Sequence, residues 1–274
     1  MPKQTRTPAY ILVILGLICL IQLLPFYLGL TTSLKGSRDL SSVWKVPFDS
    51  LTFENFSIAW ERGNIGQAIV NSAIITVVTT VLVVVIGALA SYPLARRRTK
   101  MNQLVLLLCL AVMMIPPLSI LVPLIKLLNS MNLLNTFPGL ILPLAALSLP
   151  QAIFLYTQSL RGIPEGMEEA ARIDGAGVWR IFFQIVLPML KPVTISVVIL
   201  TGVNKWNEFA LSNYIMTTDT TRPLAPAIAS FFGAAGANVN AAVAGALMGV
   251  VPVLIAYIFL QKYFMKGMMD GAIK

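Results

Sequence analysis

The most restrictive feature of this sequence is a series of apolar stretches, each long enough to cross a lipid bilayer. A hydrocarbon core about 30 Å thick requires roughly 20 apolar residues in a helix that rises about 1.5 Å per residue. The sequence therefore predicts an all-α integral membrane protein with six transmembrane helices in a single domain over residues 1–274. The predicted spans cover residues 9–30, 68–90, 104–125, 138–156, 192–214 and 241–260, and the fifth is clearly apolar only as far as Val203.

The composition supports a membrane protein and disfavours a soluble enzyme. Only 11% of the residues are charged and the mean hydropathy is +0.81, whereas a soluble domain is typically about a quarter charged. Histidine is absent, so the commonest general base and metal ligand is missing, and we expect neither a metal site nor catalytic residues. Cys19 and Cys109 lie in apolar runs without CxxC spacing, so we expect them to act as small hydrophobic residues in lipid-facing or packed helices, with no disulfide framework.

The distribution of lysine and arginine predicts the orientation in the membrane. One set of segments consists of both termini, residues 96–100 and residues 161–191, and its net charge is +8, against +1 on the opposite side. The positive-inside rule then places both termini in the cytoplasm. The first stretch is longer than the apolar part of a signal peptide and lacks a cleavage site, so we expect a retained anchor. Because the cations are scattered over loops, they do not indicate nucleic-acid binding.

Several prolines interrupt the predicted spans. Each proline removes one backbone donor and frees one carbonyl, which neighbouring helices or a wet cavity must satisfy. Kinked helices suit a protein that opens a path and changes shape, although static kinks are also common in membrane helices. The prolines concerned are Pro25, Pro116, Pro117, Pro123, Pro143, Pro150 and Pro252.

Charged side chains are almost absent from the predicted spans, and Lys205 and Glu208 are the exceptions. They are three residues apart and therefore share one helical face, with Trp206 and Asn207 between them. Two interpretations are open: a polar belt at the lipid headgroups, or the lining of a translocation path. In either case no chain of carboxylates crosses the membrane, which disfavours the proton relay of an ion-driven secondary transporter.

The segment 161–191 has more structure than a simple connection needs. Pro164 suits the start of a helix, and Glu165, Glu168 and Glu169 complement the positive end of its dipole. The sequence Asp174-Gly175 predicts a turn that ends this helix after Ile173. A second helix is expected from about Val178 to Val186, broken by Leu187-Pro188, with Phe182, Ile185 and Val186 on one face. We interpret this helix–turn–helix as a docking element for a cytoplasmic protein.

This segment resembles the EAA loop of ABC importer permeases. The matching residues are Glu169-Ala170-Ala171, Asp174-Gly175-Ala176, Ile185, Leu187-Pro188 and Pro192. Other stretches are similar to the carbohydrate-uptake branch of that family, which includes the maltose permease subunit. They are Asn71-Ser72, Ser91 to Arg96, Trp206-Asn207-Glu208-Phe209 and the ending from Gln261 to Lys274. Ser91 before Tyr92, and Asp270 near the end, depart mildly from the family pattern.

The resemblance implies a type I ABC importer permease in a bacterial or archaeal cytoplasmic (inner) membrane. Such a chain pairs with a second homologous permease, two ATP-binding cassette subunits and an extracytoplasmic solute-binding protein. It binds no cofactor itself, because ATP and Mg are held by the ATPases, and this sequence contains no GxxxxGK[ST] phosphate loop. ATPase closure is expected to pull on the EAA helix and to switch the cavity between inward-facing and outward-facing states.

The resemblance also implies which residues carry the function. Glu169 is expected to contact a basic residue of the ATPase, unless it is simply a solvated acid in the first helical turn. The expected coupling residues are Glu169, Ala170, Ala171, Asp174, Gly175 and Ala176, with Gly175 allowing the sharp turn. Possible translocation-path residues are Asn71, Trp206, Asn207 and Glu208. The loop from Ser212 to Asn240 is a candidate contact for the binding protein.

The sequence defines the substrate only broadly. An oligosaccharide or related polyol is the first expectation, and glycerol phosphate or another small polar solute is the second. A secondary transporter or channel is the alternative from another class, and a membrane-embedded enzyme is a third. The enzyme lacks support because no nucleophile–base pair or metal-ligand cluster is present in the sequence.

Overall fold

The computed structural model describes the backbone of residues 9–272, except residues 37, 38, 40, 41, 98 and 234–237, and side chains mainly between residues 10 and 259. All regular elements of these residues are helices, apart from one antiparallel bridge between Lys35 and Leu51. The all-α prediction is therefore confirmed. The extreme C-terminal residues Ile273 and Lys274 of the predicted family pattern lie outside the described residues.

The chain divides into two compact units, which are described separately. The first consists of residues 1–65 and 227–252, and the second of residues 66–226 and 253–274. The first unit contains α1 (Ala9–Ser33), α2 (Glu54–Glu61), the 3₁₀ helix η3 (Ser230–Phe232) and the beginning of α13 (Val239–Ala272). Most apolar side chains along α1 are exposed, as expected of a helix surrounded by lipid.

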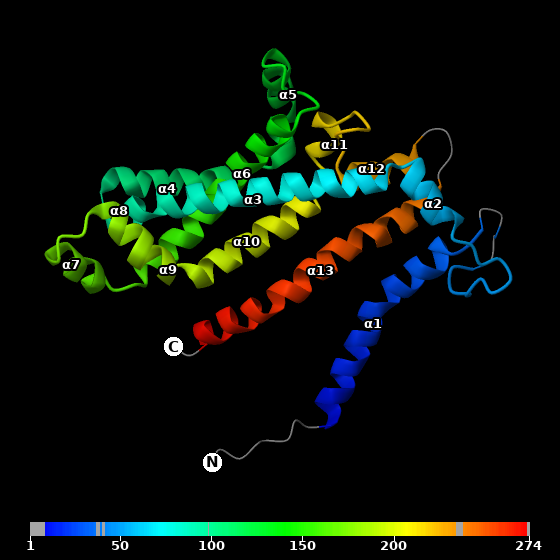
Figure 1. Ribbon diagram of the computed structural model, residues 1–274, viewed down its shortest axis with the longest axis horizontal. Coiled ribbons are helices and arrows are strands. Elements are labelled where there is room, and N and C mark those ends of the chain that lie inside the picture. The colour runs from blue at the N-terminus through cyan, green and yellow to red at the C-terminus, as the bar shows by residue number, and fades with distance from the viewer. Residues whose placement is uncertain (1–8, 37–38, 40–41, 98, 234–237, 273–274) are drawn as a thin grey trace. The chain divides into compact units, whose positions relative to one another are not determined.

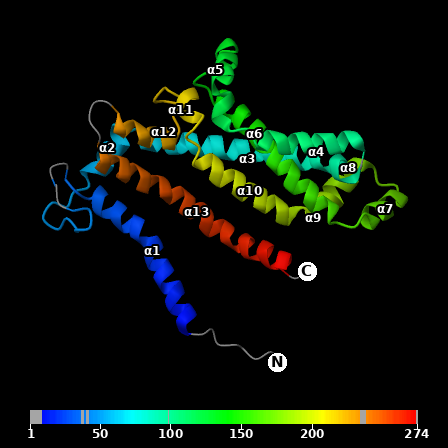
Figure 2. The same cartoon turned by 180° about the vertical axis from the view of Figure 1, so that it is seen from behind.

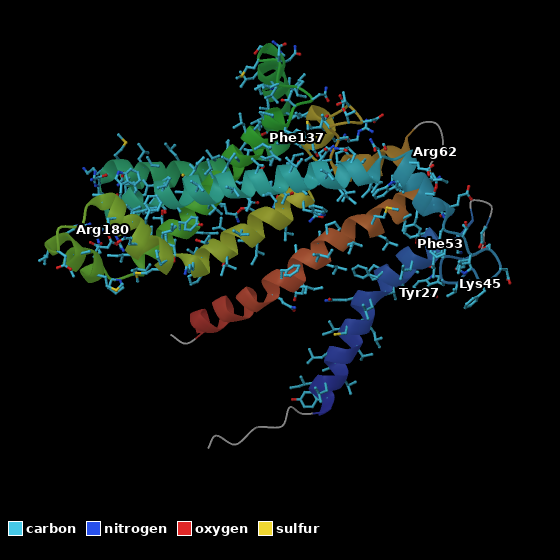
Figure 3. The ribbon with its side chains drawn as sticks, viewed as in Figure 1. Tyr27, Lys45, Phe53, Arg62, Phe137 and Arg180 are labelled. Atoms are coloured by element: carbon cyan, nitrogen blue, oxygen red, sulfur yellow. The ribbon has the colours of Figure 1, made fainter. Side chains whose placement is uncertain are left out.

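A buried asparagine organises the first unit. The Nδ2 atom of Asn55 on α2 donates hydrogen bonds to the carbonyl oxygens of Ser33 and Lys35, at 2.8 and 2.7 Å. The Nδ2 atom of Asn240 on α13 donates to the same Lys35 carbonyl at 3.2 Å. The end of α1 is thereby tied to α2 and to the start of α13. Figure 3 labels Tyr27, whose hydroxyl donates to the carbonyl oxygen of Trp44 at 2.7 Å.

The second unit is a helical bundle. Its long members are α3 (Ile65–Arg96), α4 (Lys100–Met113), α6 (Phe137–Arg161) and α10 (Lys191–Trp206), and they run alongside one another (Figures 1 and 2). The first residue of α3, Ile65, belongs to the first unit. At one end lie α7 (Gly166–Ile173), α8 (Val178–Ile181), the π-helix η2 (Phe182–Val186) and α9 (Leu187–Met189). At the other end lie η1 (Pro117–Ile120), α5 (Leu121–Ser130), α11 (Ser212–Ile215) and α12 (Leu224–Ala229). Phe137 and Arg180 mark the two ends in Figure 3.

Four helices are long and apolar enough to span a bilayer, namely α1, α3, α6 and α13. Two further candidates are bent pairs: α4 with η1 and α5, bent by 93°, and the α8–α9 segment with α10, bent by 72°. Within the described residues, four to six segments are therefore long and apolar enough to cross a membrane.

The third predicted span, 104–125, is not a continuous helix. α4 ends at Met113, and Pro116 is extended, with φ −61° and ψ 129°. Two successive prolines remove two backbone donors, and proline disfavours the helical conformation of the residue before it, so the chain turns here.

The fifth predicted span, 192–214, also ends early as a helix. α10 stops at Trp206, and residues up to Tyr214 form turns and the short helix α11. The Glu208 carboxylate accepts hydrogen bonds from the backbone N–H groups of Leu211 at 2.7 Å and Ser212 at 2.9 Å. This carboxylate stabilises the first turn of α11 in place of a continuing α10.

The helix break that was expected at Leu187-Pro188 lies two residues after Pro188, at Leu190. The π-helix η2 precedes Pro188, which sits in the first turn of α9, and the chain bends at Leu190 before α10. A π-turn shifts the local hydrogen-bond pattern, and the first turn of a helix tolerates proline because its N–H needs no partner there. The helical segment therefore continues past Pro188.

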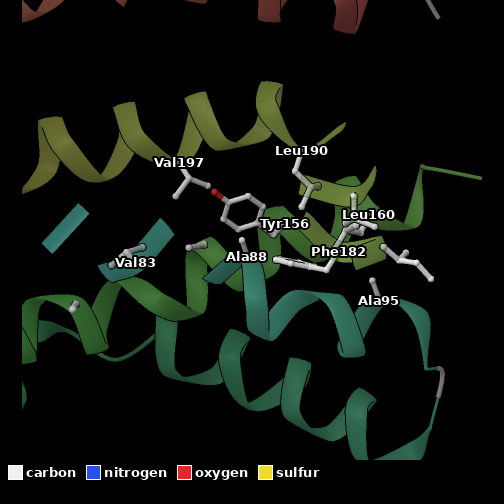
Figure 4. Packing of buried hydrophobic residues seen from close by; sticks show 12 residues of the cluster. Val83, Ala88, Ala95, Tyr156, Leu160, Phe182, Leu190 and Val197 are labelled. Atoms are coloured by element: carbon white, nitrogen blue, oxygen red, sulfur yellow. The ribbon is translucent and has the colours of Figure 1, made fainter. Parts of the chain in front are cut away.

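The core of the bundle forms where α3, α6, η2 and α10 meet (Figure 4). The figure labels Val83 and Ala88 of α3, Tyr156 of α6, Phe182 of η2 and Val197 of α10, all almost completely buried. The ring of Phe182 packs edge-on against Tyr92, with centroids 5.5 Å apart. Of the three residues predicted to share one face of the second loop helix, Phe182 and Val186 are buried and Ile185 is half-buried. This packing fixes the loop helices to the membrane bundle.

Candidate functional site

The predicted turn between the two loop helices has the geometry of a Schellman motif. α7 ends at Ile173, and Gly175 has a positive φ of 81°. The N–H of Ala176 donates to the carbonyl of Ala171 at 2.9 Å, and the N–H of Gly175 donates to that of Arg172 at 3.0 Å. These two bonds satisfy carbonyls at the end of α7, and glycine adopts the left-handed conformation without strain. The local prediction of a turn at Asp174-Gly175 is confirmed.

The predicted coupling residues do not all face the same way. Glu169, Ala170, Asp174 and Gly175 are exposed, whereas Ala171 and Ala176 are half-buried and pack against the chain's own core. An added Cβ at Gly175 would meet no atom within 4 Å. The turn therefore offers a free surface made of Glu169, Ala170, Asp174 and Gly175.

A buried ion pair attaches α7 to the end of α3. The Nε atom of Arg96 donates to Oε1 of Glu168 at 2.7 Å, and its Nη2 atom lies 2.6 Å from the same oxygen. The Tyr92 hydroxyl donates to Oε2 of Glu168 at 2.8 Å. Only 3% of the Glu168 side chain and 8% of the Arg96 side chain are exposed. Removing one partner of a buried pair typically costs about 3–5 kcal/mol, because the other charge stays buried and unpaired.

Arg96 also connects the ion pair to α6. Its Nη1 atom donates to the carbonyl oxygens of Leu160 at 2.9 Å and Ile163 at 3.2 Å, at the end of α6. One guanidinium group therefore joins α3, α6 and α7. We call Tyr92, Arg96 and Glu168 the anchor. From the sequence, Glu168 was expected only to complement the dipole at the start of a helix. The i, i+4 spacing of Tyr92 and Arg96 at the end of a span places both side chains on one helical face, which indicates a shared polar partner.

Large apolar side chains surround the exposed turn. Ile173 is 87% exposed, Trp179 69% and Val178 61%. The ring of Trp179 stacks on Phe183 with centroids 6.1 Å apart, so these side chains form a connected surface on α8 and η2. Apolar side chains gathered beside an acidic residue are typical of a surface that contacts another protein.

The second feature of this unit is a groove between α4, α6 and α10, with a volume of about 970 Å³. Most of its lining residues are apolar, and we call it the polar groove after the polar side chains that they accompany. Ser148 and Gln151 of α6 line one wall of it. The second wall consists of the end of α10, with Asn204 and Lys205, and of the residues after it, Asn207, Glu208 and Phe209. Apolar residues of α4 and of the break after it complete the groove, including Val112, Met113, Ile115 and Pro117.

The predicted path residues are only partly brought together. Asn207 and Glu208 line the polar groove, whereas Trp206 is not among the lining residues. Asn71 is fully buried elsewhere, where its Nδ2 atom donates to the carbonyl oxygens of Thr220 and Arg222, each at 3.0 Å. Gln151 and Asn204 also line the groove, and they were not among the predicted path residues. Ser148 and Gln151, three residues apart in an apolar run, were the available signal.

A bundle of apolar helices with a polar groove and an exposed helix–turn–helix is the arrangement that the sequence predicted for the transport subunit of a membrane importer. The model of the family described as "Binding-protein-dependent transport system inner membrane component" matches residues 83–270. The chain belongs to this family, whose members are permease subunits of transporters and not enzymes in themselves. The resemblance to ABC importer permeases is confirmed.

Individual relatives agree with this assignment. The chain is 40% identical to a melibiose/raffinose/stachyose import permease protein of Bacillus subtilis, over 99% of this chain and 98% of the relative. It is 35% identical to a diacetylchitobiose uptake system permease protein of Streptomyces coelicolor, over 93% and 85% of the two chains. The fold is similar to that of a bacterial ABC transporter involved in the import of the acidic polysaccharide alginate, with a TM-score of 0.78, 20% identity and coverage of 96% and 100%.

Proposed function

We propose that this chain forms one half of the translocation path of an ATP-driven importer for an oligosaccharide. Its partners are a second homologous permease, two ATP-binding cassette subunits that hold ATP and Mg, and an extracytoplasmic solute-binding protein. The chain crosses the inner membrane six times, with both termini in the cytoplasm. Family membership and the names of the sugar permeases among its relatives support this proposal.

The observation that carries the proposal is the anchored α7–α8 turn. Its exposed residues Glu169, Ala170, Asp174 and Gly175 stand beside the apolar side chains of Ile173 and Trp179. An ATPase subunit would receive Glu169 with a basic side chain and cover the apolar surface. Because the anchor joins α7 to α3 and α6, a displacement of the turn would move the ends of both helices. Alternating access would follow from this coupled movement.

The polar groove would form this chain's share of the path. Asn207 and Glu208, expected from the sequence, both line it. Glu208, however, is engaged by the backbone of α11, so its contribution is to shape the end of the groove. Asn71 would act beside the path by holding the segment 220–222, since both hydrogen bonds that its Nδ2 atom donates go there, while its Oδ1 atom accepts from Gln67 Nε2 at 3.0 Å.

Reconstitution tests the assembly. The chain should copurify with a sister permease and an ATPase, and proteoliposomes should accumulate labelled raffinose or melibiose only with ATP and a binding protein. Accumulation driven by an ion gradient without ATP would show a secondary transporter instead. The absence of any ATPase from the purified complex would also contradict the proposal.

The segment Ser212 to Asn240 is the proposed contact for the binding protein, although residues 234–237 lie outside the described residues. A variant with residues 230–238 shortened should lose the stimulation of ATPase activity by a loaded binding protein. Its basal ATPase activity should stay at the native level, because the docking turn is unchanged. Unchanged stimulation would refute this contact.

A further inference from the structure

The polar groove holds side chains that the protein itself leaves without hydrogen-bond partners. Several of its polar groups are engaged: the Ser148 hydroxyl donates to the Leu144 carbonyl at 2.7 Å, and Asn207 Nδ2 donates to the Val203 carbonyl at 2.8 Å. The side chains of Gln151, Asn204 and Lys205, in contrast, make no hydrogen bond and no ion pair with any residue that the structure describes. Three such groups in one groove are available to a ligand.

The charges of the groove favour a neutral ligand. Among the described residues that line it, Lys205 and Glu208 are the charged ones, so their charges cancel. The Glu208 carboxylate is held by two backbone N–H groups, which leaves the Lys205 ammonium as a free donor. An anion would therefore meet the fixed carboxylate of Glu208 as well as the ammonium group, whereas an uncharged hydroxyl would not be repelled.

The chemistry of the free groups matches a sugar ring. The amides of Gln151 and Asn204 both donate and accept hydrogen bonds, as hydroxyl groups do, and an ammonium group donates to hydroxyl lone pairs. Phe209 lines the same groove and is 44% exposed, so its ring can cover the apolar face of a sugar. The volume of about 970 Å³ lies at the upper end of the roughly 300–1,000 Å³ of small-molecule sites.

We infer that Gln151, Asn204, Lys205 and Phe209 form a subsite through which this chain itself binds a neutral sugar ring during translocation. The inference rests on the proposed function, and adds that the chain contacts the substrate directly and selects for hydroxyl groups. Lys205 is the specificity-determining residue, because it supplies the single charged donor. A hydrogen bond to a charged group contributes enough that its loss changes binding about 10- to 100-fold.

The test uses the complete importer in proteoliposomes with labelled raffinose. Lys205→Met keeps the length of the side chain and removes its donors. Uptake at saturating binding protein should fall about tenfold or more, while ATPase stimulation by the loaded binding protein persists. Lys126→Met, on α5 outside the groove, is the matched control and should transport at the native rate. Equal uptake by the native and Lys205→Met importers would overturn the subsite alone, whereas no uptake by the native importer would overturn the proposed function and this inference with it.

A second measurement does not depend on transport. Ala210 lines the groove beside Phe209, so a cysteine placed there, in a chain with Cys19 and Cys109 replaced by alanine, reports access by its reaction with a maleimide. Raffinose should slow this reaction in the native background and fail to do so in Lys205→Met. A cysteine that never reacts in the assembled importer would show that the sister permease fills the groove, and a reaction that raffinose never slows would show that no sugar binds there; either result overturns the subsite.

Discussion

Replacing Glu168 with alanine should detach α7 from the membrane bundle. The substitution removes the carboxylate that accepts from Arg96 and Tyr92. It leaves a guanidinium group, on a side chain that is 8% exposed, with only the more distant and half-exposed carboxylate of Glu165 as a counter-charge, 3.8 Å from Nη1. Loss of one partner of a buried pair costs about 3–5 kcal/mol. Arg96 keeps its bonds to the carbonyls of Leu160 and Ile163, so we take the lower value of about 3 kcal/mol. At 1.4 kcal/mol for each factor of ten, the detached population rises more than about 100-fold.

Limited trypsin cleavage of the purified permease, without ATPases, measures this population. Cleavage after Arg172 or Arg180 requires local opening of the helices, so its rate follows the fraction of detached molecules when opening is fast relative to cleavage. Glu169→Ala is the matched control, because Glu169 is exposed on the same helix and its loss should change stability by less than about 0.5 kcal/mol. Arg96→Ala combined with Glu168→Ala should destabilise less than the sum of the two single changes.

The result that would refute this reasoning is a cleavage rate of Glu168→Ala within about threefold of the native rate. The ion pair would then contribute little, and the attachment of α7 would depend on the apolar packing of Phe182 and Val186. Additive effects of the two single changes would lead to the same conclusion.

Three further changes address other parts of the bundle. Gly175→Val forces an L residue into a left-handed conformation, which costs about 1–2 kcal/mol. The amount of sugar imported per ATP hydrolysed should fall, while the amount of permease in the membrane stays unchanged. Normal uptake would contradict the docking role. Asn71→Ala leaves the carbonyls of Thr220 and Arg222 unpaired, which should cost about 1–3 kcal/mol in a thermal unfolding assay; an unchanged melting curve would argue against this role. Phe182→Ala creates a cavity beside Tyr92 and should destabilise the protein by about 3–5 kcal/mol; tolerance in the same assay would show that the core is not tightly packed there.

The sequence alone determined the features that depend on neighbouring residues. Long apolar runs predicted α1, α3, α6 and α13, because lipid requires every backbone polar group to be satisfied within the segment and a helix does this locally. The turn at Asp174-Gly175 was equally predictable, since a positive φ is a property of one residue and glycine adopts it at little cost.

The tertiary structure decided what depends on residues far apart in the chain. Glu168 bonds Arg96 from 72 positions away, and Asn71 holds a carbonyl 149 positions further on, so no local pattern identifies either partner. The prolines signalled an interruption near Pro116, but only the structure showed that the chain turns there by 93°. Gln151 and Lys205 belong to one groove because two helices meet. A helix is defined by hydrogen bonds within a few residues, whereas a site is defined by which side chains the packing of several helices brings into contact.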